Sequence, residues 1–194
     1  MASTKTFTIF AGVNGVGKST LFAADSAADL GVRLNTDEIV KSKGWDWKDP
    51  RAQIEAGKEL LKRQKDCLEK GISFNQETTL SGVSIVKCIE TAKSKGYKIN
   101  LRYVGVNSPE IAKERVAKRI ALGGHGVSQE TIDRRFNASK ENFKKVFSLC
   151  DTVNIYDNSG DGLVLIASYV NGKLNRFDFP CKWADELLSG IIIS

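Results

Sequence analysis

The sequence predicts an α/β fold, in which a mostly parallel β-sheet lies between two layers of helices and an antiparallel hairpin follows at the C-terminal end. Two observations support this prediction. Short apolar, β-branched runs alternate with helical patterns from residue 7 to residue 157, which is typical of strands joined by helical crossovers. The dipeptide Asn171-Gly172 then separates two further strand-like runs, and this dipeptide favours a two-residue hairpin turn.

A glycine-rich loop joins the first predicted strand to the first predicted helix. The strand is Phe7–Ala11, and the helix is expected from Lys18 to about Leu30. Residues 12–20 read GVNGVGKST, which matches the pattern G-x-x-x-x-G-K-[ST]. In such a loop the backbone N–H groups converge on phosphates, the lysine reaches the β- and γ-phosphates, and the serine hydroxyl binds Mg²⁺. The pattern therefore predicts the three-layer P-loop NTPase fold.

The nucleotide-binding residues expected from this loop are contiguous in the sequence. They are Gly12, Val13, Asn14, Gly15, Val16, Gly17, Lys18, Ser19 and Thr20. We predict that they bind a nucleoside triphosphate, with Ser19 as the metal ligand.

The segments after this loop are predicted from apolar periodicity and from capping residues. They are a strand at 32–35, a loop at 42–48, a helix from Pro50 to about residue 70, a strand at 72–76, a helix at 81–95, a strand at 99–106, a helix from Pro109, a helix from 129 to 149 and a strand at 152–156. The hairpin strands are expected at 163–170 and 173–179, before a short helix and an apolar tail at 191–193. In the helix that starts at Pro50, the spacing of Ile54, Leu61 and Leu68, with Leu60 and Cys67 beside them, predicts the buried face.

The composition is that of one domain with a substantial core. The chain has 194 residues, of which 41% are hydrophobic, and its net charge is +6 with scattered basic residues. We expect a single domain over 1–194, with a core at 5–160 and the hairpin and tail at 161–194. The modest charge favours an enzyme for phosphorylated ligands and makes a nucleic-acid partner unlikely.

Cysteine usage and the N-terminal residues bear on the compartment. The four cysteines lie far apart without a C-x-x-C motif, and Cys67 and Cys88, which lie among apolar residues of predicted helices, are interpreted as small buried apolar side chains. The N-terminal residues lack a secretory pattern, and no apolar run approaches about 18 residues. A cytoplasmic protein with no membrane contact is therefore expected.

Polar side chains follow three predicted strands at the edge where open α/β sheets bind ligands. Asp37 and Glu77 are candidates for a carboxylate that orients an acceptor, although a surface carboxylate is more often only solvated. The candidate cations for a transferring phosphoryl group are Arg115, Arg119, Arg134 and Arg135, around a glycine-rich hinge at 123–126. The only histidine, His125, lies in that hinge, where it either contacts phosphate or merely occupies a turn.

Six segments of the chain resemble the zeta toxin family of P-loop kinases, in the order of the family and over about residues 7–160. They are AGVNGVGKST (11–20), NTDE (35–38), QETTLS (76–81), RVAKR (115–119), GGH (123–125) and YDNS (156–159). Known toxins of this family phosphorylate the 3′-hydroxyl of the sugar in UDP-N-acetylglucosamine. The resemblance, which is strongest to compact stand-alone bacterial members, implies an ATP- and Mg²⁺-dependent kinase for a small hydroxyl-bearing acceptor, with a UDP-sugar as the favoured case and an antitoxin as a possible protein partner.

The resemblance also implies a role for each matching residue. Asp37 matches the carboxylate that activates the acceptor hydroxyl, and Asn158 falls where the family contacts the nucleotide base. The residues implied in catalysis are Asp37, Lys18, Arg115 and Arg119. Those implied in substrate binding are Glu77, Thr79, His125 and Arg135. The longer toxins have a second phosphate-contacting arginine where this chain has His125, so Arg119 or Arg135 would have to take over its role.

Two alternatives remain at this level. The chain could phosphorylate another acceptor, such as a nucleotide, a nucleic-acid end or a metabolite. It could also be a nucleotide-dependent switch that hydrolyses ATP slowly. The sequence has no obvious apolar strand ending in aspartate of the Walker B kind, whereas Asp37 and Glu77 make an acceptor site the better interpretation.

Overall fold

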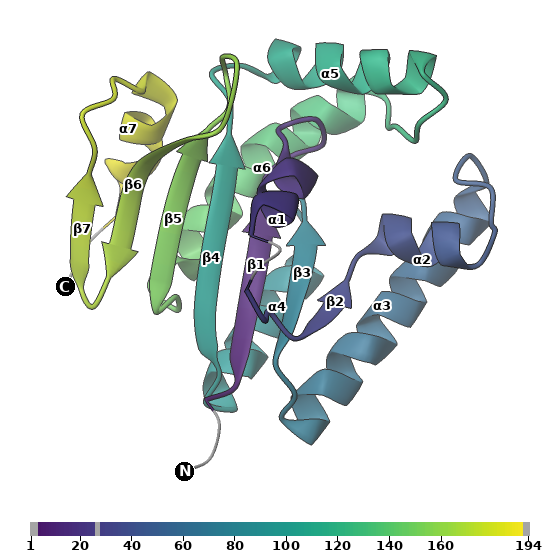
Figure 1. The fold of residues 1–194 in the computed structure, drawn as a ribbon, viewed down its shortest axis with the longest axis horizontal. Coiled ribbons are helices and arrows are strands. Elements are labelled where there is room, and N and C mark those ends of the chain that lie inside the picture. Colours follow the sequence, from purple (N-terminus) through teal and green to yellow (C-terminus); the bar gives the residue numbers. More distant parts are fainter. Residues whose placement is uncertain (1–3, 26–27, 192–194) are drawn as a thin grey trace.

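A seven-stranded sheet with helices on both faces forms the centre of the protein (Figure 1). The computed structural model describes residues 4–25 and 28–191. Across the sheet the strand order is β2-β3-β1-β4-β5-β6-β7. The strands are β1 (Thr6–Ala11), β2 (Val32–Leu34), β3 (Phe74–Thr78), β4 (Lys98–Gly105), β5 (Thr152–Asp157), β6 (Val164–Val170) and β7 (Lys173–Arg176).

The sheet is mostly parallel, as the sequence predicts. Strands β2, β3, β1, β4 and β5 pair in parallel, whereas β6 is antiparallel to both of its neighbours. Asn171 and Gly172 join β6 to β7 with φ angles of 51° and 79°. Both values are in the left-handed region that a two-residue hairpin turn of this kind requires. The predicted fold class, a parallel core with a C-terminal antiparallel hairpin, is confirmed.

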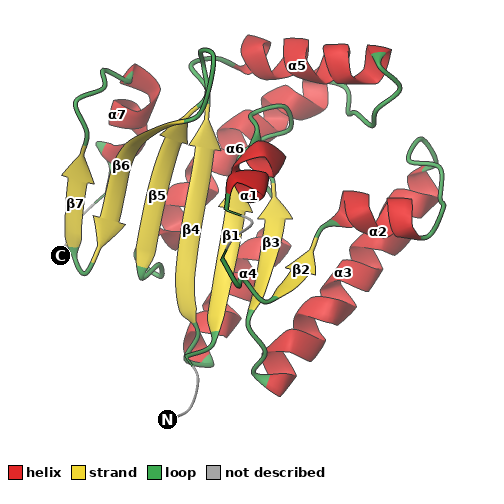
Figure 2. Ribbon diagram, in the orientation of Figure 1, coloured by secondary structure: helices red, strands yellow, loops and turns green. Residues whose placement is uncertain are grey.

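Helices cover the two faces unequally (Figure 2). They are α1 (Lys18–Ala24), α2 (Thr36–Ser42), α3 (Pro50–Lys70), α4 (Val83–Ser94), α5 (Pro109–Ala121), α6 (Gln129–Phe147) and α7 (Lys182–Leu188). One apolar cluster packs α1 and α5 on the sheet, and a larger one packs α3, α4, α6 and α7. Because successive side chains of a strand point to opposite faces, Phe7 and Ile9 of β1 enter the larger cluster and Phe10 enters the smaller.

Several predicted boundaries are wrong. Helix α1 ends at Ala24 instead of near Leu30, although residues 26 and 27 are outside the described part of the chain. Strand β3 begins at Phe74, two residues later than expected, and β7 ends at Arg176 instead of Phe179. In the predicted apolar tail, residues 192–193 also lie outside the described residues.

Helix α2 is an element that the sequence did not predict. It begins at Thr36 because the side chain of Asn35 accepts hydrogen bonds from the backbone N–H groups of Asp37 and Glu38, at 2.8 and 3.4 Å. An asparagine in this capping position satisfies amides of the first helical turn that have no partner in the helix. Asp37 is therefore held on the first turn of a helix, directly after β2.

The predicted buried face of α3 is right for Leu60 and Cys67 and wrong for Ile54 and Leu61. Ile54 and Leu61 are 59% and 48% exposed, respectively. The side chains that α3 buries are instead Ala52, Ala56, Leu60, Gln64 and Cys67. Small side chains spaced four residues apart let the helix approach its neighbours closely, so packing selects this stripe over the larger apolar residues.

None of the helices within residues 4–25 and 28–191 has the length and apolar character needed to cross a membrane.

Candidate active site

The glycine-rich loop lies between the carboxyl end of β1 and the start of α1, at the centre of the sheet. Gly12 and Gly15 have φ angles of 137° and 86°, and a Cβ at either position would collide with the backbone carbonyl oxygen of Val104 or Ala112. Only glycine fits there, because an added side chain would meet rigid backbone. The loop is therefore fixed between β4 and α5.

Lys18 is held inside the loop. Its Nζ donates a 2.9 Å hydrogen bond to the carbonyl oxygen of Val13, and its side chain is buried. Burial lowers the pKa of Lys18 below its ordinary value, against the opposing charges of Glu77 and Asp37. A buried cation beside converging backbone N–H groups is a site for an anion.

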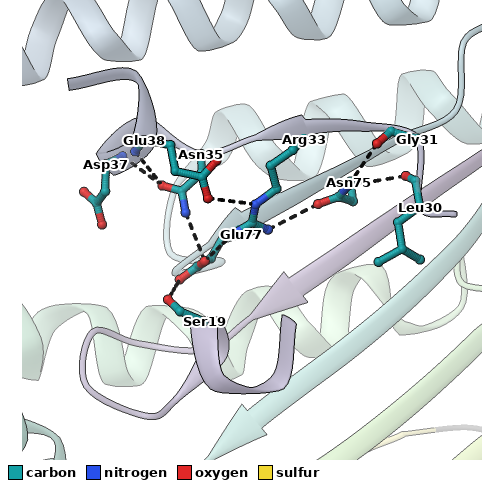
Figure 3. A network of polar contacts seen from close by, with 9 residues as sticks. All are labelled: Ser19, Leu30, Gly31, Arg33, Asn35, Asp37, Glu38, Asn75 and Glu77. Atoms are coloured by element: carbon teal, nitrogen blue, oxygen red, sulfur yellow. Dashed lines mark hydrogen bonds and ion pairs between the residues drawn. The ribbon is translucent and has the colours of Figure 1, made fainter. Parts of the chain in front are cut away.

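Glu77, on β3, connects the phosphate loop to β2 (Figure 3). Its Oε1 accepts a 2.9 Å hydrogen bond from Ser19 Oγ. Its Oε2 accepts hydrogen bonds from Arg33 Nη2 at 2.7 Å and from Asn35 Nδ2 at 3.0 Å. The carboxylate is thus fixed on three sides, with one oxygen directed at the serine of the loop.

Arg33 is a residue of this network that the sequence analysis missed. Its Nη1 donates to Asn75 Oδ1 at 3.2 Å, and its guanidinium lies 3.6 Å from the centroid of the Phe22 ring. Stacking on an aromatic ring and ion pairing hold the planar guanidinium in one orientation. The available signal was a single arginine between Val32 and Leu34 in a short strand, and this signal is too weak to assign a partner.

Glu77 occupies the position that an acidic Mg²⁺ ligand takes in P-loop proteins, at the end of a strand beside the loop. Strand β3 pairs directly with β1, which places Phe10 opposite Glu77. The sequence analysis missed this relationship because β3 carries polar Asn75 and Gln76 where an apolar run was sought. A serine hydroxyl and a carboxylate fit Mg²⁺, which is usually bound by one or two protein groups together with phosphates.

No cluster of three or more metal-binding side chains is present in the described part of the chain. Ser19 and Glu77, which are in contact, form a pair whose oxygens fit Mg²⁺, and a bound nucleotide would have to supply further ligands.

Two cavities meet at Asp37. The first, of about 360 Å³, contains the phosphate-loop lysine and most of the predicted substrate residues on its wall: Lys18, Asp37, Glu77, Thr79, His125 and Arg135. The second, of about 500 Å³, is more aromatic and is lined in part by Phe22, Arg33, Lys41, Trp45 and Trp47. Asp37 and His125 line both cavities, so they lie at the boundary between a polar and an aromatic compartment.

Asp37 and His125 are in direct contact. His125 Nε2 lies 2.6 Å from Asp37 Oδ2, and both side chains are partly exposed. Burial alone would raise the pKa of Asp37, but the hydrogen bond from His125 and the charges of His125, Lys18 and Arg119 outweigh it, so the pKa lies below its ordinary value. Asp37 is therefore ionised at neutral pH.

The predicted arginines differ in their surroundings. Arg119 has a buried Nε and Nη2 that lack a hydrogen-bond partner among the described residues, and its charge acts on both Lys18 and Asp37. Arg135 Nη1 donates to Asn14 Oδ1 of the phosphate loop at 2.8 Å. Arg134 is exposed, and within residues 4–25 and 28–191 it has no hydrogen bond to the phosphate loop.

Arg115 and Asn158 lie together beside the phosphate loop. Arg115 Nη1 and Nη2 donate to the carbonyl oxygens of Asn158 and Gly160, at 2.8 and 3.3 Å. Asn158 Nδ2 in turn donates to Val16 O at 2.8 Å. In this conformation the two side chains connect the loop after β5 to α5 and to the phosphate loop.

Comparisons with known proteins identify related chains. A family model described as "Zeta toxin" matches residues 51–168, which is more than half of the chain and includes Glu77, Arg119 and His125. An uncharacterized protein of Haemophilus influenzae is 33% identical over 128 residues, which cover 66% of this chain and 89% of that protein.

Solved structures share the fold. A chain of the AvrRxo1-ORF1:-ORF2 complex with ATP is 19% identical, with a TM-score of 0.71 over 96% of this chain. This chain spans 64% of the length of that one. A chain from the PezAT toxin-antitoxin system of Streptococcus pneumoniae is 19% identical, with a TM-score of 0.58 over 81% of this chain and 69% of its own.

Proposed function

The chain belongs to the zeta toxin family, and from this premise we propose that it is a kinase that transfers the γ-phosphoryl group of ATP to a hydroxyl group of a small acceptor. One observation carries the proposal: Lys18 and Asp37 line the same cavity of about 360 Å³. A kinase must bring a phosphate-binding lysine and an acceptor-orienting carboxylate to one space. A nucleotide switch needs the lysine but not the carboxylate.

The donor side of the cavity supplies positive charge. Lys18 would meet the β- and γ-phosphates, and the unpartnered nitrogens of Arg119 would donate to the oxygens of the transferring group. Arg135 lies close enough to the loop to add a third cation. Ser19 and Glu77 would hold Mg²⁺, which neutralises phosphate charge when bound.

Asp37 would act on the acceptor. Its carboxylate accepts the hydrogen bond of the acceptor hydroxyl and directs that oxygen at the γ-phosphorus. As the new O–P bond forms and the bond to the leaving ADP oxygen breaks, the hydroxyl proton passes to Asp37. In a loose transition state such positioning matters more than early removal of the proton.

The best candidate for the acceptor is the sugar 3′-hydroxyl of UDP-N-acetylglucosamine. The aromatic side of the second cavity, with Trp45 and Trp47, suits a planar base, and Lys41 on the same wall suits a phosphate group. Asp37 lies where this cavity meets the phosphate loop, so an extended acceptor bound there would present a hydroxyl group to the donor.

A protein partner is a further part of the proposal. The PezAT protein pair is described as a toxin-antitoxin system, and AvrRxo1-ORF1 was solved together with AvrRxo1-ORF2. By analogy, we propose that an antitoxin binds this chain.

The experiment is to incubate the protein with ATP, Mg²⁺ and a panel of acceptors. The panel holds UDP-sugars, nucleotides and a 5′-hydroxyl oligonucleotide, and mass spectrometry detects any phosphorylated product. A UDP-sugar product supports the full proposal, another product corrects the acceptor, and ATP hydrolysis without any product favours the switch.

Asp37→Asn tests the role of the carboxylate, with Asp66→Asn on the exposed surface of α3 as a matched control. Because the amide cannot accept the proton, transfer should fall by about 10²–10⁴, while ATP affinity stays within a few-fold of the wild-type value. Near-normal transfer would exclude the role. Calorimetry of ATP binding with and without Mg²⁺ tests the rival role. If ATP binding by Asp37→Asn no longer depends on Mg²⁺, Asp37 is a metal ligand instead.

A further inference from the structure

The loop at 123–126 contacts two functional groups at once. Its His125 reaches Asp37 at 2.6 Å. A Cβ on Gly124 would lie 2.7 Å from Arg119 Cγ and 3.0 Å from the Arg119 carbonyl oxygen, and a Cβ on Gly126 would collide with Ile120. The two glycines therefore let the loop pack tightly on the last turn of α5. As a result His125 and Arg119 are held in a fixed relation to each other.

The contact between His125 and Asp37 occupies only one carboxylate oxygen. Asp37 Oδ2 faces the imidazole, and within the described residues no hydrogen bond to Oδ1 is present. The backbone of Asp37 is fixed separately, by the bond from its N–H to the side chain of Asn35. Because the main chain of Asp37 and its Oδ2 are both fixed, the direction of Oδ1 is fixed as well, and Oδ1 is the oxygen that would accept a hydrogen bond from an acceptor hydroxyl group.

We propose that His125 is a positioning residue for phosphoryl transfer, which orients the Asp37 carboxylate toward the acceptor hydroxyl. This inference rests on the proposed function. Because the 123–126 loop packs on Arg119, the imidazole that orients Asp37 and the cation expected at the transferring phosphoryl group are held in place by the same segment. An oriented carboxylate directs the hydroxyl oxygen at the phosphorus, and phosphoryl transfer depends mainly on such positioning.

The charged groups around the pair are consistent with this role. Lys18 and Arg119 act on Asp37 from the phosphate loop and from α5, and Arg135 is near it on α6. These cations favour the ionised carboxylate, but within the described residues none of them forms a hydrogen bond or ion pair with its oxygens. His125 is therefore the residue that fixes the direction of the carboxylate, whereas the cations contribute charge.

The test is a mutant cycle between His125 and Asp37. Four proteins are compared with the wild type: His125→Ala, His125→Gln, Asp37→Asn and the double variant His125→Ala/Asp37→Asn. Leu122→Ala, at a position 88% exposed beside the loop, is the matched control. The kcat and the KM for ATP are measured with the acceptor that the wild type phosphorylates.

We expect His125→Ala to lower kcat by about 10- to 100-fold with the KM for ATP within about threefold, because misplacing the base affects the transition state more than ATP binding. His125→Gln, whose amide can donate the same hydrogen bond, should recover most of the rate. When Asp37→Asn is already present, adding His125→Ala should lower kcat by less than about threefold, because the effects of two residues that act as a unit are not additive.

Three results would overturn the inference. They are an unchanged kcat in His125→Ala, an effect confined to the KM for ATP, and an equal loss in both backgrounds. If the wild type phosphorylates no acceptor of the panel, the proposed acceptor fails, and the same cycle is run on ATP hydrolysis, where water takes the place of the acceptor. The two proposals therefore fail separately.

Discussion

The indole Nε1 of Trp183 donates a 2.7 Å hydrogen bond to Oδ1 of Asp157, and both residues are buried. Asp157 ends β5, and its carboxylate also accepts hydrogen bonds from the backbone N–H and the hydroxyl of Ser159 and from the thiol of Cys181. Asn158 lies between Asp157 and Ser159 and donates to Val16 in the phosphate loop. The C-terminal helix α7 is therefore linked through one carboxylate to the loop that would bind ATP.

Trp183→Phe tests this link. The substitution keeps an aromatic ring against Gly105 but leaves the buried carboxylate with one donor fewer, and a lost bond to a charged group costs about 1.5–3 kcal/mol. We expect a lower melting temperature and weaker ATP binding by calorimetry, because Asn158 would be less well placed. Phe177→Leu, at an exposed position outside both this link and the two cavities, is the control. Normal ATP affinity together with reduced stability would limit Trp183 to a structural role.

Lys18→Ala tests the phosphate loop. Removing a charge-assisted contact of this kind should weaken ATP binding by about 10- to 150-fold and abolish transfer. The fold should persist, because the buried ammonium is replaced by a small apolar group. The control is Lys65→Ala on the exposed side of α3, and circular dichroism checks the fold. Unchanged turnover in a folded Lys18→Ala protein would contradict the assignment of the loop.

Arg119 and Arg115 should give different kinetic effects. Arg119 has buried donors without partners, so Arg119→Ala should lower kcat by about 10³-fold or more, as for other arginines that stabilise the transferring phosphoryl group. Arg115 is already bonded to backbone carbonyls of the loop after β5, so Arg115→Ala should mainly raise the KM for ATP. Steady-state kinetics on both variants separate the two roles. If Arg115→Ala instead lowers kcat and Arg119→Ala raises the KM for ATP, the loop after β5 must rearrange when the nucleotide binds.

The four thiols should be unreactive in the folded protein. Burial raises the pKa of Cys67, and it raises the pKa of Cys88 and Cys150 to about 12 and that of Cys181 to about 11. Since the thiolate is the reactive form, a raised pKa leaves very little of it at pH 8. A thiol-specific colour reagent should therefore react slowly in buffer and with all four cysteines after denaturation. Rapid reaction of a native thiol would show that its surroundings open in solution.

Much of the fold follows from local sequence patterns. The alternation of strands and helices, the phosphate-loop motif between β1 and α1, and the Asn171-Gly172 turn were each predicted from neighbouring residues, and the structure contains each of them. The buried face of α3 was predicted only in part, because apolar spacing identified the buried Leu60 and Cys67 but also the exposed Ile54 and Leu61. Whether a helix buries large or small side chains depends on how closely its neighbours approach, and that distance is not encoded within the helix.

The sequence by itself determined the fold class, the phosphate loop and the residue types of the site, because these depend on conformational preferences over a few adjacent residues. Only the tertiary structure decided which of these side chains meet. Ser19 and Glu77 are 58 positions apart, and they are in contact because β3 lies beside β1 in the sheet. His125 reaches Asp37 because two glycines let its loop pack on α5. Strand order and loop packing are set by contacts between distant segments, so no local pattern could have specified these pairs.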